Sequence, residues 1–474
     1  MCGGEGSGVR RRISIYVLGL GLMMPFEVSG SDDEASTART AEGASQPESV
    51  RNYLAQPFNS YSFWNLPVHV DAWSKGYYKP AHLQPLTFRT SSAHNDLLFL
   101  DPSAPERQIF RTPLSSAWDY TGLGATQNRI KVRCDTAVDT LPGPKALIPD
   151  GFSTITDLPG LGATPDLPTA ILNPANAFEG LSVRETQPLE VCPDGKVVAA
   201  VDYAREFPID ERGDGRCGTS SGGGVGLRTA TCPTGSQGAT GLPASGGLIR
   251  RGEFSAGEIR HALKLSIPVG ELYGRNRKLN PAGFVWPANG IDSYADVNGG
   301  GYCGDPDGRA GTNRYIYSGS QYVLDPNFDM ASLRSAPGLI IAKALRDYGA
   351  YVVDTLGPPC SSNPFTVSER TLHVEMGPGM NDGRPDVRAE FLNLYGYDMD
   401  VLSSAPQTPF SSDMATIWSH TYVMWHPCMN DKDPNGGACA KFVGGGPTCD
   451  PASKRRGPIV LEGTNRPQCP AWAR

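Results

Sequence analysis

Short apolar runs separated by turn residues recur along most of the chain. Val197–Tyr203 and His261–Ile267 are two such runs, and Ala350–Thr355 and Thr371–Met376 are two more. Short runs rich in β-branched and aromatic residues and bounded by turn residues are typical of β-strands. The pattern therefore predicts a mainly β protein, and the number of short runs favours a β-sandwich or jelly-roll-like body with long glycine-rich loops.

The alternation within these runs predicts which side chains share a face, because successive side chains of a strand point in opposite directions. His261 shares a face with the three aliphatic residues at alternate positions after it, and we expect that face to point toward the core. In Thr371–Met376 the alternation places His373 and Glu375 together, opposite the apolar residues. We expect that face either to be solvated, the reading we favour, or to form one pocket that both side chains share.

Helical signals are few. Ser335 is placed as an N-cap, Pro337 lies in the first turn, and Gly349 follows the last apolar position, so one longer helix is expected over Ala336–Tyr348. The sequence Ser255-Ala256-Gly257-Glu258 has the form of a capping box and predicts a short helical turn that starts there.

Composition narrows the class of protein. The 474 residues include 56 glycines and 41 prolines, about a fifth of the chain, which excludes a helical bundle or coiled coil. Charged residues make up 19% and the net charge is −7, so we expect no nucleic-acid partner. Glycine is densest in residues 213–252, where a long and nearly uncharged loop system is expected.

The N-terminus has the form of an export signal. Three arginines, Arg10–Arg12, precede an apolar run from Ile13 to Met24 that is too short to span a bilayer. Ser31 stands where a lipoprotein signal would need its cysteine, which argues against a lipid anchor. We expect a signal peptide over 1–30, a disordered linker over 31–52, a β-rich main domain over 53–400 and a Cys-rich C-terminal extension over 401–474. The localisation is expected to be secreted or extracellular, with periplasm or cell surface open and no integral membrane span.

Ten cysteines follow the signal segment, an even number that in an exported chain predicts up to five disulfides. None lies in the C-x₂-C or C-x₄-C spacing of a zinc site, so disulfides are favoured over metal. The ten are Cys134, Cys192, Cys217, Cys232, Cys303, Cys360, Cys428, Cys439, Cys449 and Cys469.

Candidate catalytic residues are a histidine, four acids and a tyrosine. His261 is a candidate acid or base near neutral pH, and the alternative is a buried histidine bonded to the backbone. Glycoside hydrolysis needs two carboxylates, whereas a polysaccharide lyase needs a base such as His261 or Tyr351. Taken singly, each acid is more often a surface or hydrogen-bonding residue. The acids are Asp202, Glu206, Asp354 and Glu375.

No organic cofactor is expected, because Gly222–Gly226 lacks the context of a phosphate-binding loop and no Gly-x-Ser-x-Gly motif occurs. An oxygen-rich loop over 292–307 suits calcium, but an ordinary polar turn is the reading we favour. Its oxygen-bearing residues are Asp292, Asp296, Asn298, Asp305 and Asp307.

Three blocks carry a family resemblance. Pro57–Val68 contains Ser-x-Trp-Asn-x-Pro, Gly241–Leu263 ends in Ile-x-His-Ala-Leu, and Ala342–Asp354 contains Tyr-Gly-Ala-Tyr-Val-Val-Asp. Together they resemble a family of secreted bacterial β-rich proteins. The resemblance implies secretion and a β-rich fold and assigns no activity. Lys196 stands where that family often has a histidine, which leaves no histidine at this turn.

These observations predict a secreted carbohydrate-active enzyme that cleaves an extracellular polysaccharide, as a hydrolase or a lyase. The alternative is a non-catalytic secreted glycan-binding or cell-surface protein. The two differ in one structural respect: the enzyme needs His261 in one groove with at least two of the four acids.

Overall fold

The computed structural model places part of the chain. The described residues are 51–59, 62–68, 78–80, 96–111, 142–150, 168–175, 180–191, 194–216, 235–237, 240–268, 272, 284–285, 287–291, 316–356, 370–379, 386–399 and 407–424. The chain divides into two units, Met1–Val50 and Arg51–Arg474, and every described residue belongs to the second. The signal segment, all cysteines and the 292–307 loop lie outside the described residues.

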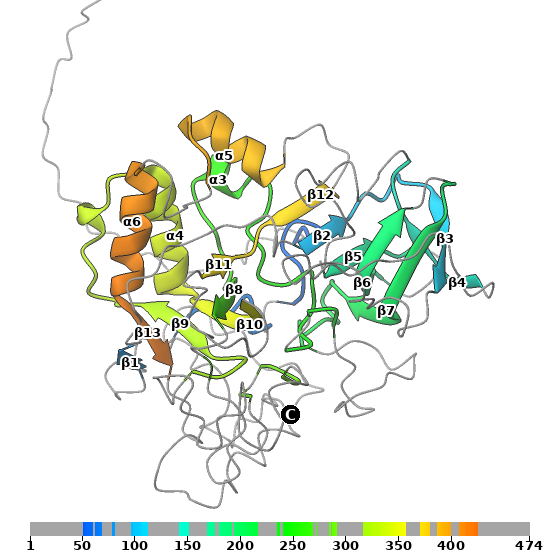
Figure 1. The fold of residues 1–474 in the computed structure, drawn as a ribbon, viewed down its shortest axis with the longest axis horizontal. Helices are drawn as coiled ribbons and strands as arrows, with labels where there is room; N and C mark the ends of the chain where they lie inside the picture. Colours follow the sequence, from blue (N-terminus) through cyan, green and yellow to red (C-terminus); the bar gives the residue numbers. More distant parts are fainter. Residues whose placement is uncertain are drawn as a thin grey trace, which may run out of the picture. The chain divides into compact units, whose positions relative to one another are not determined.

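Most regular structure in the described part of the chain is β (Figure 1). The strands are β1 (Tyr78–Pro80), β2 (Asp96–Phe99), β3 (Glu106–Arg111), β4 (Pro142–Leu147), β5 (Thr169–Leu172), β6 (Ser182–Val191), β7 (Val197–Pro208), β8 (Leu263–Pro268), β9 (Gln321–Leu324), β10 (Ala350–Leu356), β11 (Thr371–Leu372), β12 (Glu375–Gly379) and β13 (Thr421–Met424). The helices are α3 (Glu253–Ala256), α4 (Ala336–Asp347), α5 (Val387–Tyr395) and α6 (Pro409–Ser419), with one 3₁₀ turn at Met330–Ser332. A mainly β fold is therefore confirmed.

The strands form two mixed sheets. The first has six strands in the order β1-β13-β9-β10-β8-β11, and the second has seven in the order β12-β2-β5-β6-β7-β3-β4. In the first sheet β8 and β10 are parallel, and in the second β2 is parallel to both β12 and β5. The long hairpin β6–β7 is antiparallel and forms the centre of the second sheet.

Alternating side chains bury both faces of the central strands. In β10, Ala350 and Val352 join a core with the helices, whereas Tyr351 and Val353 join a core with residues of the second sheet. In β2, Leu98 belongs to that same shared core, and its neighbours face a third cluster beyond the second sheet. The two sheets thus share one apolar core, and the helices cover the other face of the first sheet.

The predicted helix and its ends are confirmed. Ser335 accepts a hydrogen bond from the Gly338 N–H at the start of α4, and Pro337 lies in the first turn. Gly349 has φ +79°, the left-handed conformation that ends many helices. The strands expected over 197–203 and 350–355 are also present, as parts of β7 and β10.

Two local predictions are wrong. The capping box at Ser255 does not start a helix. Ser255 lies inside α3, which runs from Glu253 to Ala256 and is followed by Gly257 in the left-handed conformation. The run Thr371–Met376 is not one strand, because β11 joins the first sheet and β12 the second. A period-two pattern cannot reveal such a change of sheet, since each half keeps an extended backbone.

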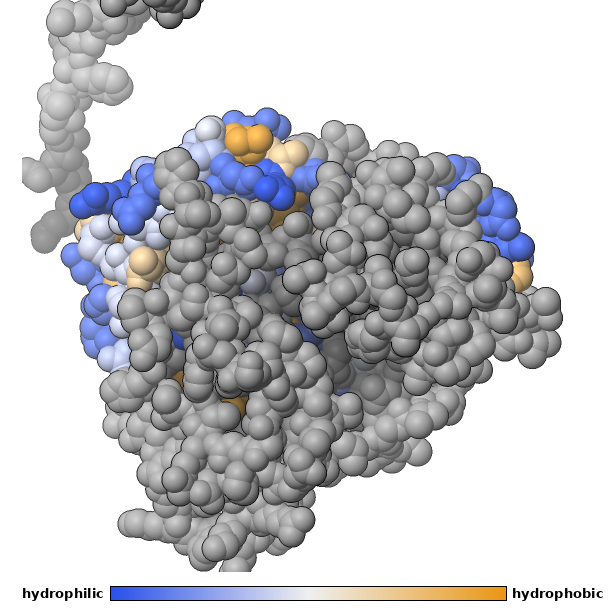
Figure 2. All heavy atoms as spheres, viewed as in Figure 1, coloured by the Kyte–Doolittle hydropathy of each residue, from blue (hydrophilic) through white to orange (hydrophobic). Residues whose placement is uncertain are grey.

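Two helices were not expected. Asp386 caps α5, and Thr408 with Ser411 forms the capping box of α6. α6 packs against α4, and the next strand, β13, pairs with β9, so 407–424 belong to the main body. Figure 2 shows mostly hydrophilic side chains over these helices, with apolar ones at α5, where Leu392 and Leu394 are exposed.

No helix in the described part of the chain is both long enough and apolar enough to cross a membrane.

Candidate functional site

The three sequence blocks of the family resemblance meet at Trp64. The indole Nε1 donates to the Gly215 carbonyl at 2.9 Å, and the Trp64 carbonyl accepts from the Ala262 N–H at 2.6 Å. Tyr351 packs edge-on against the indole, with ring centroids 5.6 Å apart. A Cβ at Gly247, where φ is +73°, would lie 2.3 Å from the indole. The glycines of the second block are thus required by close packing.

Most of the described part of the glycine-rich stretch is buried, including 235–237 and 240–251, whereas Asp214 is exposed and Gly252 is half-buried. Glu185 on β6 holds it: its carboxylate accepts from the N–H groups of Ser236 at 3.0 Å, Ala244 at 2.9 Å and Ser245 at 3.3 Å. Burial raises the pKa of Glu185, and these hydrogen bonds counteract that rise only in part. This part of the stretch is an internal support rather than an exposed loop.

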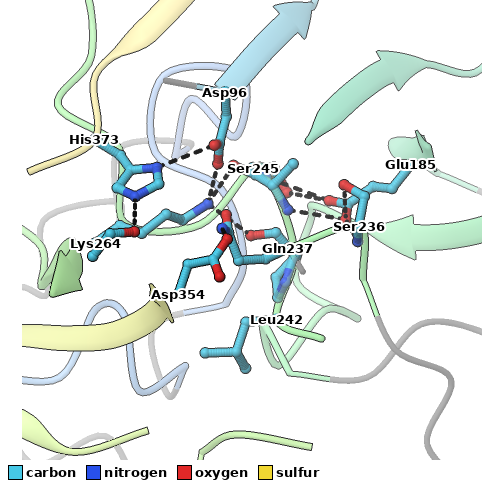
Figure 3. Close-up of polar contacts among 12 residues, drawn as sticks. Asp96, Glu185, Ser236, Gln237, Leu242, Ser245, Lys264, Asp354 and His373 are labelled. Carbon is cyan, nitrogen blue, oxygen red and sulfur yellow. Dashed lines mark hydrogen bonds and ion pairs between the residues drawn. The ribbon is translucent and has the colours of Figure 1, made fainter. Parts of the chain in front are cut away.

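A charged network lies beside this support (Figure 3). The Lys264 ammonium on β8 forms an ion pair with Asp96 Oδ2 on β2. The same ammonium donates to the carbonyls of Pro243 at 3.1 Å and Ala244 at 2.9 Å. Both charged side chains are fully buried. The pair therefore joins the two sheets through a contact that water does not reach.

His373 extends the network in a defined tautomer. Its Nδ1 lies 3.2 Å from Asp96 Oδ1 and its Nε2 lies 2.7 Å from Ser266 Oγ. Burial lowers the pKa of His373, and Asp96 opposes this only in part, so the imidazole is neutral at pH 7. Nδ1–H then donates to Asp96 and Nε2 accepts from the Ser266 hydroxyl.

The order Ser266–His373–Asp96 matches the hydrogen bonds of an acyl-transfer triad. However, Ser266 is fully buried on β8, which has paired strands on both sides. A nucleophile must be within reach of a substrate and of an oxyanion-stabilising group. The arrangement therefore acts as a buried polar support in this structure.

A second cluster surrounds His261 and α3. Its Nε2 lies 3.0 Å from Glu253 Oε1, and its Nδ1 lies 2.9 Å from the Ala262 carbonyl. Burial alone would lower the pKa of His261, but Glu253 and the carbonyl outweigh it, and the pKa is raised. Both ring nitrogens have acceptors, so neither is left to face a cleft.

Glu375 is buried between two arginines. Arg250 Nε donates to it at 2.7 Å and Arg251 Nε at 3.3 Å, and all three side chains are buried. Burial acts to raise the pKa of Glu375, but the two guanidinium groups outweigh this and the pKa is lowered. The favoured expectation of a solvated face for His373 and Glu375 is therefore wrong, and the two side chains have different partners.

The other candidates lie elsewhere. Glu206 is buried on β7 opposite Arg184, and Asp202 lies in the same strand. Asp354 is half-buried and accepts from Gln237 Nε2 at 3.1 Å. Tyr351 is buried in the shared core. His261 and Glu375 are linked through the segment 250–253, because Glu375 binds Arg250 and Arg251 and His261 binds Glu253.

The sequence reasoning missed most residues of these clusters, namely Asp96, Glu185, Arg250, Arg251, Glu253, Lys264 and Ser266. Lys264 alternates with leucines, a pattern that predicts a solvated face, and only the packing of the second sheet buries it. The described residues contain no group of three or more His, Cys, Asp or Glu that could hold a metal.

Comparisons with protein-family models, with curated proteins and with solved structures gave no match to this chain. The family resemblance therefore stays a prediction.

Proposed function

We propose that the chain is a secreted glycan-binding or cell-surface protein that does not cleave its ligand. The apolar segment after Arg10–Arg12 supports export, and the many strands support a β-sandwich-like body. We also propose that the ten cysteines after the signal segment form disulfides, as in other exported proteins. Polysaccharide is the expected partner.

One observation carries this proposal. The candidate catalytic side chains that the structure describes contact partners inside the fold. Glu375 is held as a carboxylate by two arginines and cannot supply the proton that a general acid must donate. Both ring nitrogens of His261 lie against partners inside the fold, Glu253 and the Ala262 carbonyl, so neither faces a substrate. Tyr351 is buried in aromatic packing.

The positions of the candidate acids support the same proposal. Hydrolysis of a glycosidic bond uses two carboxylates roughly 5 to 10 Å apart that flank the bond. Glu375 belongs to the α3 cluster, Asp354 to the Gln237 side of the buried network, and Glu206 to the centre of the second sheet. The requirement that His261 shares a groove with two of these acids is not supported by their contacts.

The experiment uses the purified full chain and a panel of neutral and acidic polysaccharides. Binding is measured by retardation in affinity gels, and cleavage is measured in the same samples from new reducing ends and from the absorbance of unsaturated products. We expect retardation by at least one polysaccharide without product. Absence of retardation by every polysaccharide in the panel would contradict the proposal that the protein binds a glycan.

Formation of a cleavage product would instead support the hypothesis that the protein is an enzyme. In that case His261→Gln is the deciding variant, because it keeps approximate volume and hydrogen bonding but cannot transfer a proton as imidazole does. Loss of turnover by a factor of about 10² or more, measured at a temperature where the variant remains folded, would assign catalysis to His261.

A further inference from the structure

Lys264 and Asp96 are a pair of complementary reactive groups enclosed by the fold. They lie 168 residues apart in sequence, on strands of different sheets, and both side chains are fully buried. Burying two full charges is costly even when they are paired. A neutral linkage between the same atoms would remove that cost.

The hydrogen bonds orient the amine toward the carboxyl group. Two of the three ammonium protons of Lys264 are directed to the carbonyls of Pro243 and Ala244. The third is directed to Asp96 Oδ2 (Figure 3). When the third proton moves to Oδ2, the lone pair that remains on Nζ points toward the Asp96 carboxyl group. The amine is then a nucleophile beside a neutral carboxylic acid.

The other carboxyl oxygen already has a donor. His373 Nδ1–H lies 3.2 Å from Oδ1, and Ser266 fixes the ring by donating to Nε2 at 2.7 Å. A donor in this place stabilises the negative charge that develops on Oδ1 when an amine adds to the carboxyl carbon.

We propose that Lys264 and Asp96 condense to form an intramolecular amide bond that joins the two sheets. Lys264 Nζ attacks Asp96 Cγ, the Nζ–Cγ bond forms and the Cγ–Oδ2 bond breaks. Oδ2 leaves as water with two of the three Nζ protons, and the third remains on the amide nitrogen. The positive and negative charges cancel, and the reaction needs no oxidant, reductant or cofactor.

The product fits the same surroundings. Its amide N–H keeps a carbonyl acceptor from Pro243 or Ala244, and its carbonyl oxygen keeps the His373 donor. Condensation of an amine and a carboxylic acid is slow in water, but groups held in contact by a fold react with effective concentrations of roughly 10⁵ to 10⁸ M. His373 and Ser266 are positioning residues in this scheme.

Mass spectrometry of the full-length protein, reduced and alkylated, tests the bond. Trypsin releases Asp96 in residues 90–107 and, when Lys264 is free, cuts after Lys264 to release 261–264. An amide at Lys264 blocks that cut. We expect one covalent species that joins 90–107 to 261–275 with a mass lower than the sum of the two peptides by one water molecule. Recovery of 90–107 and 261–264 as separate peptides in full yield overturns the proposal.

The chain provides its own control. Lys196 and Asp194 form an ion pair at 3.1 Å whose side chains are both about half exposed. Both residues lie in the tryptic peptide 185–196, so trypsin should cut after Lys196 and release this peptide without loss of water, since solvent competes with both groups. A link there as well would mean that sample handling, and not the fold, produces the bond.

Two variants test the chemistry. Lys264→Arg keeps the positive charge and should lose the linked species. Asp96→Asn should give the same linked species, because the amide leaves as ammonia where the acid leaves as water. A linked species in Lys264→Arg overturns the assignment of the nucleophile. If either variant fails to fold, the digest of the unsubstituted chain still decides.

Discussion

Single residues decide much of the packing in this protein, and Trp64 is the clearest case. Its indole contacts Gly246 and Gly247, and a Cβ at either position would lie within 2.5 Å of the ring. Tyr351 and Phe63 complete the aromatic group, with ring centroids 5.1 Å apart. Residues that form a recognisable motif in sequence here serve close packing, so the motif by itself says nothing of catalysis.

Gly349 gives the first prediction. Its φ of +79° is strained for other residues, and a Cβ there would lie 2.7 Å from the Tyr322 carbonyl oxygen. Gly349→Ala should lower the free energy of unfolding by about 1 to 2 kcal/mol from conformation alone, and the contact with Tyr322 adds to this. Urea denaturation measures the loss.

Gly257→Ala is the matched control. Gly257 has a similar φ of +76°, but a Cβ there meets no atom within 4 Å. The Gly349 variant should therefore be the less stable of the two. Equal losses would show that the contact with Tyr322 has no effect.

His261 gives the second prediction, which concerns pH. Its pKa in the folded protein is raised above the unfolded value of 6.5, so the protonated form stabilises the fold. This contribution is complete below pH 6.5 and is lost as the pH rises through the folded pKa. His261→Gln should cost on the order of 1 to 2 kcal/mol at the acidic end and less at the alkaline end.

Unfolding curves of wild type and His261→Gln across this pH range give the difference. Glu253→Gln should also make stability depend less on pH than in wild type, because Glu253 is the carboxylate beside the imidazole. A constant difference between the His261 variant and wild type at every pH would contradict an ionised imidazole.

At the scale of elements, the short helix α3 is held from three sides. Glu375 on β12 binds Arg250 and Arg251 just before it, Glu390 on α5 accepts from the N–H groups of Gly252 and Ser255, and His261 binds Glu253. A helix of four residues has little stability of its own. Its position therefore depends on these carboxylates.

Glu375→Gln is the third prediction. The change removes the buried carboxylate that Arg250 and Arg251 share and should destabilise the fold by about 3 to 5 kcal/mol. In wild type the contribution of Glu375 is present above its unfolded pKa of 4.5 and is lost as the pH falls through the lowered folded pKa. The variant should therefore lose less stability than wild type on acidification. Both differences are read from chemical unfolding.

Glu258→Gln is the control for this change, since Glu258 pairs with Arg260 at 2.6 Å while both side chains are largely exposed. An exposed pair contributes about 1 kcal/mol or less. Similar losses in the two variants would contradict a special role for the buried carboxylate.

The elements also show what sequence can and cannot predict. α4 was predicted almost to the residue, because its cap, its apolar spacing and Gly349 are local signals. The split of 371–376 between two sheets was not, since the backbone stays extended and only distant strands decide its partners. The same reason applies to His373 and Glu375. Their alternation with apolar residues can be read from the sequence, but the groups that bury them come from β2 and from the segment before α3.

At the scale of the whole described body, the polar groups join layers. Lys264 and Asp96 connect the sheets, Glu185 connects the second sheet to the glycine-rich stretch, and Asp413 on α6 accepts from the N–H groups of Arg334 and Ser335 at the start of α4. This use of charge explains why a search for catalytic acids among buried carboxylates finds structural ones. The proposed binding function must then use surface that these carboxylates do not form.

The passage of residues 371–379 from one sheet to the other has a consequence for dynamics. β11 pairs with β8 and β12 pairs with β2, only two residues later in the chain. β11 and β12 are edge strands of the two sheets. Because they are joined by a short segment, we expect that neither detaches without displacing the other, and that the shared core around Tyr351 opens at the same time. Amide protons at the centres of both sheets should therefore exchange with solvent through the same global opening, as one cooperative unit.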